Sequence, residues 1–203
     1  MEKEIIEFVK RTQALAKTGL SYAKDPYDIE RYEELRDSSN DMLTRLVTMP
    51  LKDVKRQFAN LDTYPTPKVD VRGLVLKEGK ILLIQERTDQ KWAMPGGWCD
   101  IGYSPSENIV KEVREESGLK VKVSRLLSVW DKAKHDHPAD INYVYKLNFL
   151  CETSDYTLRP GHEAMKADYF DIDNLPPLSL MRNTENQIRK LVALANSDEF
   201  DFD

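Results

Sequence analysis

The chain has 203 residues and carries 30 Lys and Arg against 35 Asp and Glu, a formal net charge of −5 at pH 7. This acidic balance makes duplex nucleic acid a poor partner. The composition, 40% hydrophobic and 32% charged, is typical of a globular protein of one or two domains. No apolar run is long enough to span a bilayer, the charged N-terminal residues do not resemble a signal peptide, and the two cysteines suit a reducing compartment. We therefore expect a cytoplasmic protein with no membrane partner.

The N-terminal part of the chain has the apolar spacing of helices. Residues 3–16 place apolar side chains at steps of three and four, and Gly19 follows where a helix C-cap is expected. Asp25-Pro26 is typical of an N-cap followed by proline in the first helical position, and it predicts a second, longer helix. Pro50 can open a third helix, before the prolines of residues 64–67 stiffen the chain into an extended linker.

We expect residues 1–62 to form an all-helical module and residues 63–203 to form a separate α/β domain. Acidic and basic residues nearly balance in the module, so it has no basic stripe for DNA. Three short helices bury little surface by themselves. Their apolar faces should therefore cover the substrate site of the larger domain or pack on a second copy, and we predict a homodimer.

Beyond residue 67 the pattern changes to that of β-strands. Two β-rich runs separated by Lys77–Lys80 predict a hairpin, and further strands and one late helix follow. The expected strands are 69–76, 81–84, 121–130, 141–150 and 169–172, the expected helix is 183–195, and the acidic tail 197–203 is expected to be frayed.

A well-marked helix is predicted between the two sheet regions. Ser104 is a suitable N-cap, Pro105 occupies the first helical position, and Glu107 stands three residues after the cap. Together these residues form a capping box. Gly118 suits a left-handed C-cap, so the helix should span residues 105–117.

Three glutamates lie along one side of this helix. Glu112, Glu115 and Glu116 are separated by steps of three and four, which places like charges close together and makes them repel. A divalent cation would turn this repulsion into binding, and carboxylate oxygens suit Mg²⁺ or Mn²⁺. The alternative is a solvated acidic helix face. The preceding Gly96-Gly97 turn and the two tight caps favour the metal site.

These residues resemble the sequence box of the Nudix hydrolases. That box has a Gly, five residues, a Glu, seven residues, and then Arg-Glu-aliphatic-any-Glu-Glu-any-Gly-aliphatic. In this chain it begins at Gly97 and ends with residues 111–119, Lys-Glu-Val-Arg-Glu-Glu-Ser-Gly-Leu. Tyr103 replaces the first Glu and Lys111 replaces the Arg. In the family these two positions form a supporting ion pair, so their joint replacement affects how the metal-binding glutamates are oriented.

The resemblance covers nearly the whole chain and implies a fold and an activity. The implied fold is an α/β/α sandwich around a mixed sheet, preceded by a small all-helical module. The helical front piece is similar to that of bacterial hydrolases of X-linked nucleoside diphosphates, of the CDP-choline and ADP-ribose pyrophosphatase type. The implied reaction is Mg²⁺-dependent hydrolysis of the pyrophosphate bond, which gives a nucleoside monophosphate and a phosphorylated second product.

Two other functions stay open. The chain could act on nucleoside triphosphates or RNA ends, although its acidity argues mildly against long polyanions. It could also be a non-catalytic Nudix-fold sensor that binds a nucleotide. The three retained glutamates argue against the sensor, because a binding-only fold has no need for such a repulsive triplet.

The resemblance also implies roles for particular residues. Glu112 and Glu116 are the expected metal ligands, with Glu115 as a further ligand or as the base. A backbone carbonyl at Gly97 can approach a metal closely, although an ordinary tight turn is the alternative. Glu163, ahead of a late strand, is a candidate ligand or general base, and a solvent-exposed loop glutamate is its alternative reading.

For the nucleoside diphosphate-linked substrate, the candidates are two arginines of the predicted hairpin and two residues at the end of a later strand. Arg72 and Arg87 can meet phosphate oxygens with their forked donors, or they can form ion pairs at a sheet edge. Trp130 and Lys132 open a loop that can stack on a base or close over a choline-like group by a cation–π contact.

Overall fold

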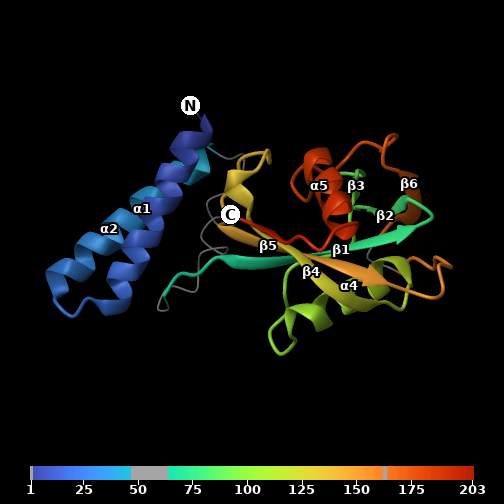
Figure 1. Cartoon of the computed structure of the whole chain (residues 1–203). Helices are drawn as coiled ribbons and strands as arrows, with labels where there is room; N and C mark the ends of the chain where they lie inside the picture. Colours follow the sequence, from blue (N-terminus) through green and yellow to red (C-terminus); the bar gives the residue numbers. More distant parts are fainter. Residues whose placement is uncertain (1, 47–63, 162–163) are drawn as a thin grey trace. The chain divides into compact units, whose positions relative to one another are not determined.

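The structure is a computed structural model, and it describes residues 2–46, 64–161 and 164–203 (Figure 1). The predicted third helix and Glu163 lie outside these residues. None of the helices in the described ranges is long and apolar enough to cross a membrane.

The chain divides into two compact units. The first takes the N-terminal residues through Pro67 together with a later segment, Ala139–Asn142. The second takes Lys68–Pro138 and Tyr143–Asp203. Local sequence does not predict that residues 139–142 group with the N-terminal helices, because this grouping depends on contacts between distant parts of the chain.

The first unit is a pair of helices, α1 (Glu2–Tyr22) and α2 (Pro26–Leu46). The Asp25 side chain accepts hydrogen bonds from the first turn of α2, as its sequence position predicts. The predicted helix end at Gly19 is wrong, because α1 continues three residues further. A Cβ at Gly19 would overlap the ring of Tyr32. The glycine therefore permits close packing of α2 on α1.

A small apolar cluster joins the two helices to the later segment. Ile141 packs with Val9 of α1 and Leu43 of α2, and all three side chains are buried. The Nζ of Lys10 donates to the carbonyl of Asn142 at 3.0 Å. The pair of helices is thus held at one end by a loop from far along the sequence.

The second unit is built on a mixed sheet of seven strands. Their order is β3-β2-β1-β5-β4-β7, and β6 pairs with β2. The pairs β1–β5 and β4–β7 are parallel and the others are antiparallel. The strands are β1 (Lys68–Lys77), β2 (Lys80–Gln85), β3 (Trp92–Ala93), β4 (Lys122–Asp131), β5 (Val144–Glu152), β6 (Lys166–Asp171) and β7 (Asp201–Phe202).

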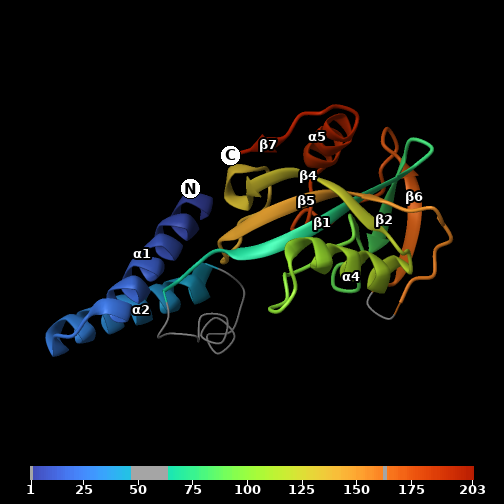
Figure 2. The same cartoon turned by 60° about the horizontal axis from the view of Figure 1, so that its bottom comes forward.

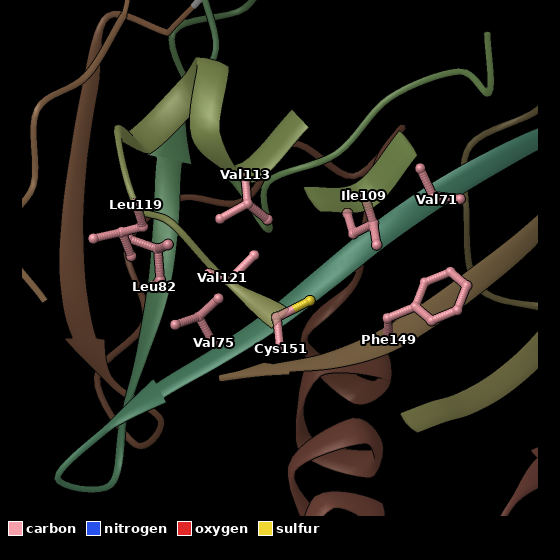
Figure 3. Close-up of a cluster of buried hydrophobic side chains, with 9 residues drawn as sticks. All are labelled: Val71, Val75, Leu82, Ile109, Val113, Leu119, Val121, Phe149 and Cys151. Atoms are coloured by element: carbon pink, nitrogen blue, oxygen red, sulfur yellow. The ribbon is translucent and has the colours of Figure 1, made fainter. Parts of the chain in front are cut away.

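Two helices cover opposite faces of this sheet, which confirms the expected α/β/α arrangement (Figure 2). They are α4 (Pro105–Ser117) and α5 (Glu185–Ala195). Alternate residues of β1 face opposite sides: Val71 and Val75 pack toward α4, and Leu74 packs toward α5. Figure 3 shows the α4 cluster, with Val71, Val75, Leu82, Ile109, Val113, Leu119, Val121, Phe149 and Cys151.

Local capping fixes both ends of α4, and the predicted bounds 105–117 are confirmed. Ser104 and Glu107 exchange the two hydrogen bonds of a capping box. Gly118 has φ +80°, the left-handed conformation that suits glycine at a helix C-terminus. The glutamate-bearing helix is therefore held in place independently of any ligand.

The prediction that the acidic tail is frayed is wrong. Asp201 and Phe202 form β7, which pairs with β4 at the sheet edge. The carboxylate of Asp201 accepts a hydrogen bond from the indole Nε1 of Trp130 at 2.5 Å. The tail is ordered because the buried indole N–H needs a partner there.

Candidate active site

The Gly96-Gly97 turn runs alongside β1 and is joined to it by backbone hydrogen bonds. The backbone N–H of Gly73 donates to the carbonyl of Pro95, and the N–H of Val71 donates to the carbonyl of Gly97, each at 2.9 Å. Gly96 has φ +139°, and a Cβ there would overlap the Val71 carbonyl oxygen. Only glycine fits at this position, which fixes the turn against the sheet.

Two of the helix glutamates face this turn. The backbone N–H of Gly96 donates to the Oε2 of Glu116 at 2.8 Å. A Cβ at Gly97 would lie only 3.1 Å from the Oε2 of Glu112. The structure therefore brings Glu112, Glu116 and the predicted Gly97 together.

Burial and neighbouring carboxylates oppose ionisation of the Glu116 carboxyl group. Burial raises the pKa of Glu116 to about 8, although the charge of Arg72 and the Gly96 N–H oppose this rise. The neighbouring carboxylates Glu112 and Glu86 raise it further. A cation placed between these carboxylates would stabilise their ionised forms.

The donor set at the turn fits a hard divalent cation. Carboxylate oxygens of Glu112 and Glu116 and the Gly97 carbonyl are the oxygen ligands that Mg²⁺ and Mn²⁺ take. The Gly97 carbonyl accepts one bond from Val71, and its second lone pair can serve a metal. Within the described ranges, no three Asp, Glu, His or Cys side chains gather into a complete ligand set. A cation here would therefore also be held by water or by the substrate.

Glu115 points along a different side of α4. Its Oε2 lies 3.6 Å from the Nζ of Lys111, one helical turn earlier. Lys111 also pairs with Asp100, at 2.7 Å, and its Nζ lies 5.9 Å from the ring centroid of Tyr103. Tyr103, Lys111 and Glu115 line a surface cavity of about 610 Å³. The two positions at which this chain departs from the Nudix box are thus adjacent in space.

Arg72 is buried and forms an ion pair. Its Nη2 lies 2.8 Å from Asp70 Oδ1, and its Nη1 donates to the Met94 carbonyl at 3.1 Å. Lys146 binds the same carboxylate. Burial opposes the charge on Asp70, but Arg72 and Lys146 outweigh this effect and lower its pKa to about 2. The two predicted roles of Arg72 were a contact with phosphate and an ion pair at a sheet edge. The structure contains an ion pair with Asp70, but the pair is buried inside the protein.

The other predicted substrate residues are not brought together. Arg87 is exposed and lies in the turn after β2, so its placement on a strand is wrong. Trp130 is fully buried among core residues and has no exposed face for a base to stack on. Stacking on Trp130 is therefore not supported. Lys132 begins the short 3₁₀ helix η1 (Lys132–Lys134) and is buried.

Sequence reasoning missed Glu86. This residue directly follows β2, its side chain is 13% exposed, and it forms an ion pair with Arg182. Burial raises its pKa, opposed by the charges of Arg182 and Arg72. Its place at a strand end beside Arg87 was the only available signal. The pairing with Arg182 joins residues far apart in sequence.

Known family models match both parts of this chain. Residues 66–194 match the NUDIX domain model, and residues 3–58 match the model described as a UDP-X-like, N-terminal oligomerisation domain. The chain therefore belongs to the NUDIX family, as a pyrophosphohydrolase that carries the N-terminal oligomerisation domain.

Several relatives share most of the chain. YjhB of Bacillus subtilis is 44% identical over 92% of this chain and 89% of its own length. The ADP-ribose pyrophosphatase of Methanocaldococcus jannaschii is 34% identical over 62% of this chain and 74% of its own. A UDP-X diphosphatase structure is 34% identical, covers 99% of this chain and 98% of its own, and has a TM-score of 0.64. An ADP-ribose pyrophosphatase structure from Streptococcus suis is 39% identical over 68% of this chain and all of its own, with a TM-score of 0.62.

Proposed function

We propose that this chain uses Mg²⁺ or Mn²⁺ to hydrolyse the pyrophosphate bond of a nucleoside diphosphate linked to a second moiety. The products are a nucleoside monophosphate and the phosphorylated second moiety. The observation that carries the proposal is the pair Glu112 and Glu116 facing the Gly96-Gly97 turn. ADP-ribose is the first candidate substrate, because two relatives are named ADP-ribose pyrophosphatases. CDP-choline is the second candidate.

The Gly97 carbonyl and the three glutamates of α4 have distinct proposed roles. Glu112, Glu116 and the Gly97 carbonyl hold the cation, and Glu115 is a further ligand or the base. When bound, the cation neutralises charge on the diphosphate and lowers the pKa of water. A carboxylate then accepts the proton of the attacking water, and Glu163 is the other candidate for this step.

Three basic residues remain candidates for substrate binding. Arg87 is exposed and can reach a phosphate oxygen. Arg72 is buried and its charge lowers the pKa of Glu116, and Lys132 begins η1 directly after β4 and is also buried. An alanine variant of each residue tests its assignment. A variant whose Michaelis constant for the substrate does not change would exclude that residue from substrate binding.

The test of the function is a substrate panel with identified products. It contains ADP-ribose, CDP-choline, UDP-glucose, dinucleoside polyphosphates and nucleoside triphosphates, each with Mg²⁺, Mn²⁺ or a chelator. We expect metal-dependent release of a nucleoside monophosphate from a diphosphate-linked substrate. Preference for triphosphates would replace the proposed substrate class. Nucleotide binding without any turnover would replace the enzyme by a sensor.

We propose that the helix pair mediates homodimer formation through an exposed apolar seam on α1. The seam consists of Phe8, Leu15 and Tyr22, which repeat every seven residues and are 71%, 60% and 71% exposed. A repeat of seven places side chains along one helix face, as in coiled coils. The matching family model is described as an oligomerisation domain.

Light scattering at micromolar concentration tests the dimer. The wild type should have the mass of two chains, and Phe8→Glu with Leu15→Glu should have the mass of one. Leu180→Glu is the control, because Leu180 is 46% exposed and belongs to the other unit. A monomeric wild type, or a doubly substituted variant that stays dimeric, would contradict the assignment.

A further inference from the structure

The carboxylate of Asp100 holds the ammonium of Lys111, which stands at the arginine position of the Nudix box. The Nζ of Lys111 is 2.7 Å from Asp100 Oδ2 and 3.6 Å from Glu115 Oε2. Tyr103 occupies the position where the Nudix box has its first glutamate, and Asp100 lies three residues before it. An ion pair thus exists in this chain, although its acidic partner comes from a different position of the loop.

The backbone of Asp100 is fixed to α4 by one buried amide. The N–H of Asp100 donates to the Oδ1 of Asn108 at 3.0 Å, and the Nδ2 of Asn108 donates to the Asp100 carbonyl at 3.3 Å. Asn108 is fully buried in the first turn of α4. The position of the Asp100 carboxylate relative to the helix is therefore set by hydrogen bonds on both sides of its own residue.

The ion pair of Asp100 and Lys111 is too exposed to contribute much to stability. The side chains are 55% and 28% exposed, and solvent screens the attraction between the charges in exposed pairs of this kind. The effect of the ion pair is to set where the Lys111 ammonium lies. The hydrogen bond to Asp100 is the largest cause that raises the pKa of Lys111, and the charges of Glu115 and Glu112 raise it further.

The carboxylates of Asp100, Glu115 and Glu112 therefore compete for the ammonium of Lys111. Without the Asp100 charge, the remaining carboxylates that act on Lys111 are Glu115 and Glu112. These are residues of the proposed metal site. An ammonium drawn to them would oppose a divalent cation by like-charge repulsion and by occupying carboxylate oxygens.

We propose that Asp100 is a positioning residue that draws the Lys111 ammonium toward the loop and so limits its pairing with the carboxylates of α4, where Glu115 Oε2 already lies 3.6 Å from its Nζ. The inference rests on the proposed function for the identity of the bound cation, and it assigns Asp100 no contact with substrate. It makes the affinity for the cation depend on Asp100 only as long as Lys111 carries its charge.

The test is a calorimetric titration of the purified full chain with Mn²⁺. Asp100→Asn should weaken Mn²⁺ binding about tenfold, and the double variant Asp100→Asn with Lys111→Met should return it to within about twofold of the wild type. Asp100→Glu should keep most of the affinity, because it keeps the carboxylate. Asp173→Asn is the matched control, because Asp173 forms a comparable exposed pair with Arg189 at 2.9 Å.

A structural role of Asp100 would give a different pattern. If Asp100→Asn acted by distorting the loop, removal of the Lys111 charge would not restore binding, and that result would overturn the proposal. Unchanged Mn²⁺ affinity in Asp100→Asn would overturn it as well.

Hydrolysis measurements separate this proposal from the proposed function. In Asp100→Asn the Mg²⁺ concentration for half-maximal rate should rise about tenfold, while kcat at saturating Mg²⁺ stays within about twofold. A wild type with no hydrolysis but with the expected Mn²⁺ pattern would contradict the function and support the role of Asp100. Hydrolysis by the wild type, with equal Mn²⁺ affinity in all the variants, would support the proposed function and contradict the role of Asp100.

Discussion

The backbone N–H of Gly96 donates to the Oε2 of Glu116 at 2.8 Å, and this bond connects the glycine turn beside β1 to the helix that carries the glutamates. Because Gly96 also packs closely on the Val71 carbonyl, the turn contacts both β1 and α4. The carboxylates of the proposed metal site are thus oriented by the fold before any cation binds.

Replacing Gly96 by alanine should damage these contacts severely. The new Cβ would overlap a backbone oxygen at a φ of +139°, so we expect a loss of roughly 3–5 kcal/mol in unfolding free energy by urea titration. Gly79→Ala is the control, because Gly79 also has positive φ but open space around it. Its cost should be about 1–2 kcal/mol. Equal losses at the two positions would contradict the packing argument.

Asp70→Asn should destabilise the core of the second unit. Asp70 is buried, and it is the shared partner of Arg72 and Lys146. Removing its charge deprives two buried cations of their hydrogen-bonded carboxylate, and such losses cost about 3–5 kcal/mol. Asp173→Asn, which breaks an exposed pair with Arg189, should leave the urea midpoint nearly unchanged. Similar urea midpoints for the two variants would show that the pairing of Asp70 does not stabilise the fold.

His137 should make the stability fall in mildly acidic solution. Its Nδ1 lies 2.6 Å from the Leu180 carbonyl, and burial lowers the pKa of His137 to about 4. A histidine with a lowered folded-state pKa stabilises fully above its unfolded value, near 6.5, and this contribution is lost as the pH falls toward 4. The loss amounts to roughly 3 kcal/mol for this shift.

The corresponding variant is His137→Gln, whose amide N–H can still donate to Leu180. Urea titrations of both proteins at pH 7 and pH 4 should give a smaller drop in unfolding free energy for the variant. Parallel pH curves for wild type and variant would show that His137 is not the titrating group.

Gly19→Ala should destabilise the helix pair, although alanine favours helices by about 1 kcal/mol over glycine. The added Cβ would overlap Tyr32, and overpacking of this kind costs typically about 1–3 kcal/mol. In a Tyr32→Ala background, Gly19→Ala should be stabilising instead of destabilising. It should then raise the melting temperature of the helix pair, measured by circular dichroism. A stabilising effect in the wild-type background would show that α2 does not press on Gly19.

Local signals explain which parts of this fold were predictable. The helix from Pro105 to Ser117 was predicted to the residue, because Ser104, Glu107 and Gly118 cap it within a few positions of its ends. The sequence pattern predicts that the first helix ends near Gly19, but Gly19 packs on Tyr32 and α1 continues to Tyr22. Strand β7 was missed because its order depends on partners about seventy positions earlier, Trp130 among them.

The same division holds at the site. Glu112, Glu116 and Gly97 follow from one short stretch of sequence, so their pattern could be read directly. The pairing of Asp100 with Lys111 requires the loop to fold back on α4, and the approach of Glu86 to Arg182 requires the sheet. The prediction that Trp130 stacks on a base is wrong because the side chain is buried. The sequence around a tryptophan at a strand end does not distinguish a side chain that faces solvent from one that faces the core.

The most direct measurement is the rate of ADP-ribose hydrolysis with saturating Mg²⁺ in the wild type, Glu116→Gln and Glu185→Gln. Glu185 is an exposed glutamate of the first turn of α5, so it serves as the matched control. We predict a wild-type rate that a chelator abolishes, a fall of about a hundredfold or more in Glu116→Gln, and no change in Glu185→Gln. Metal-dependent hydrolysis that survives in Glu116→Gln would contradict the assignment of the turn and its two glutamates as the active site.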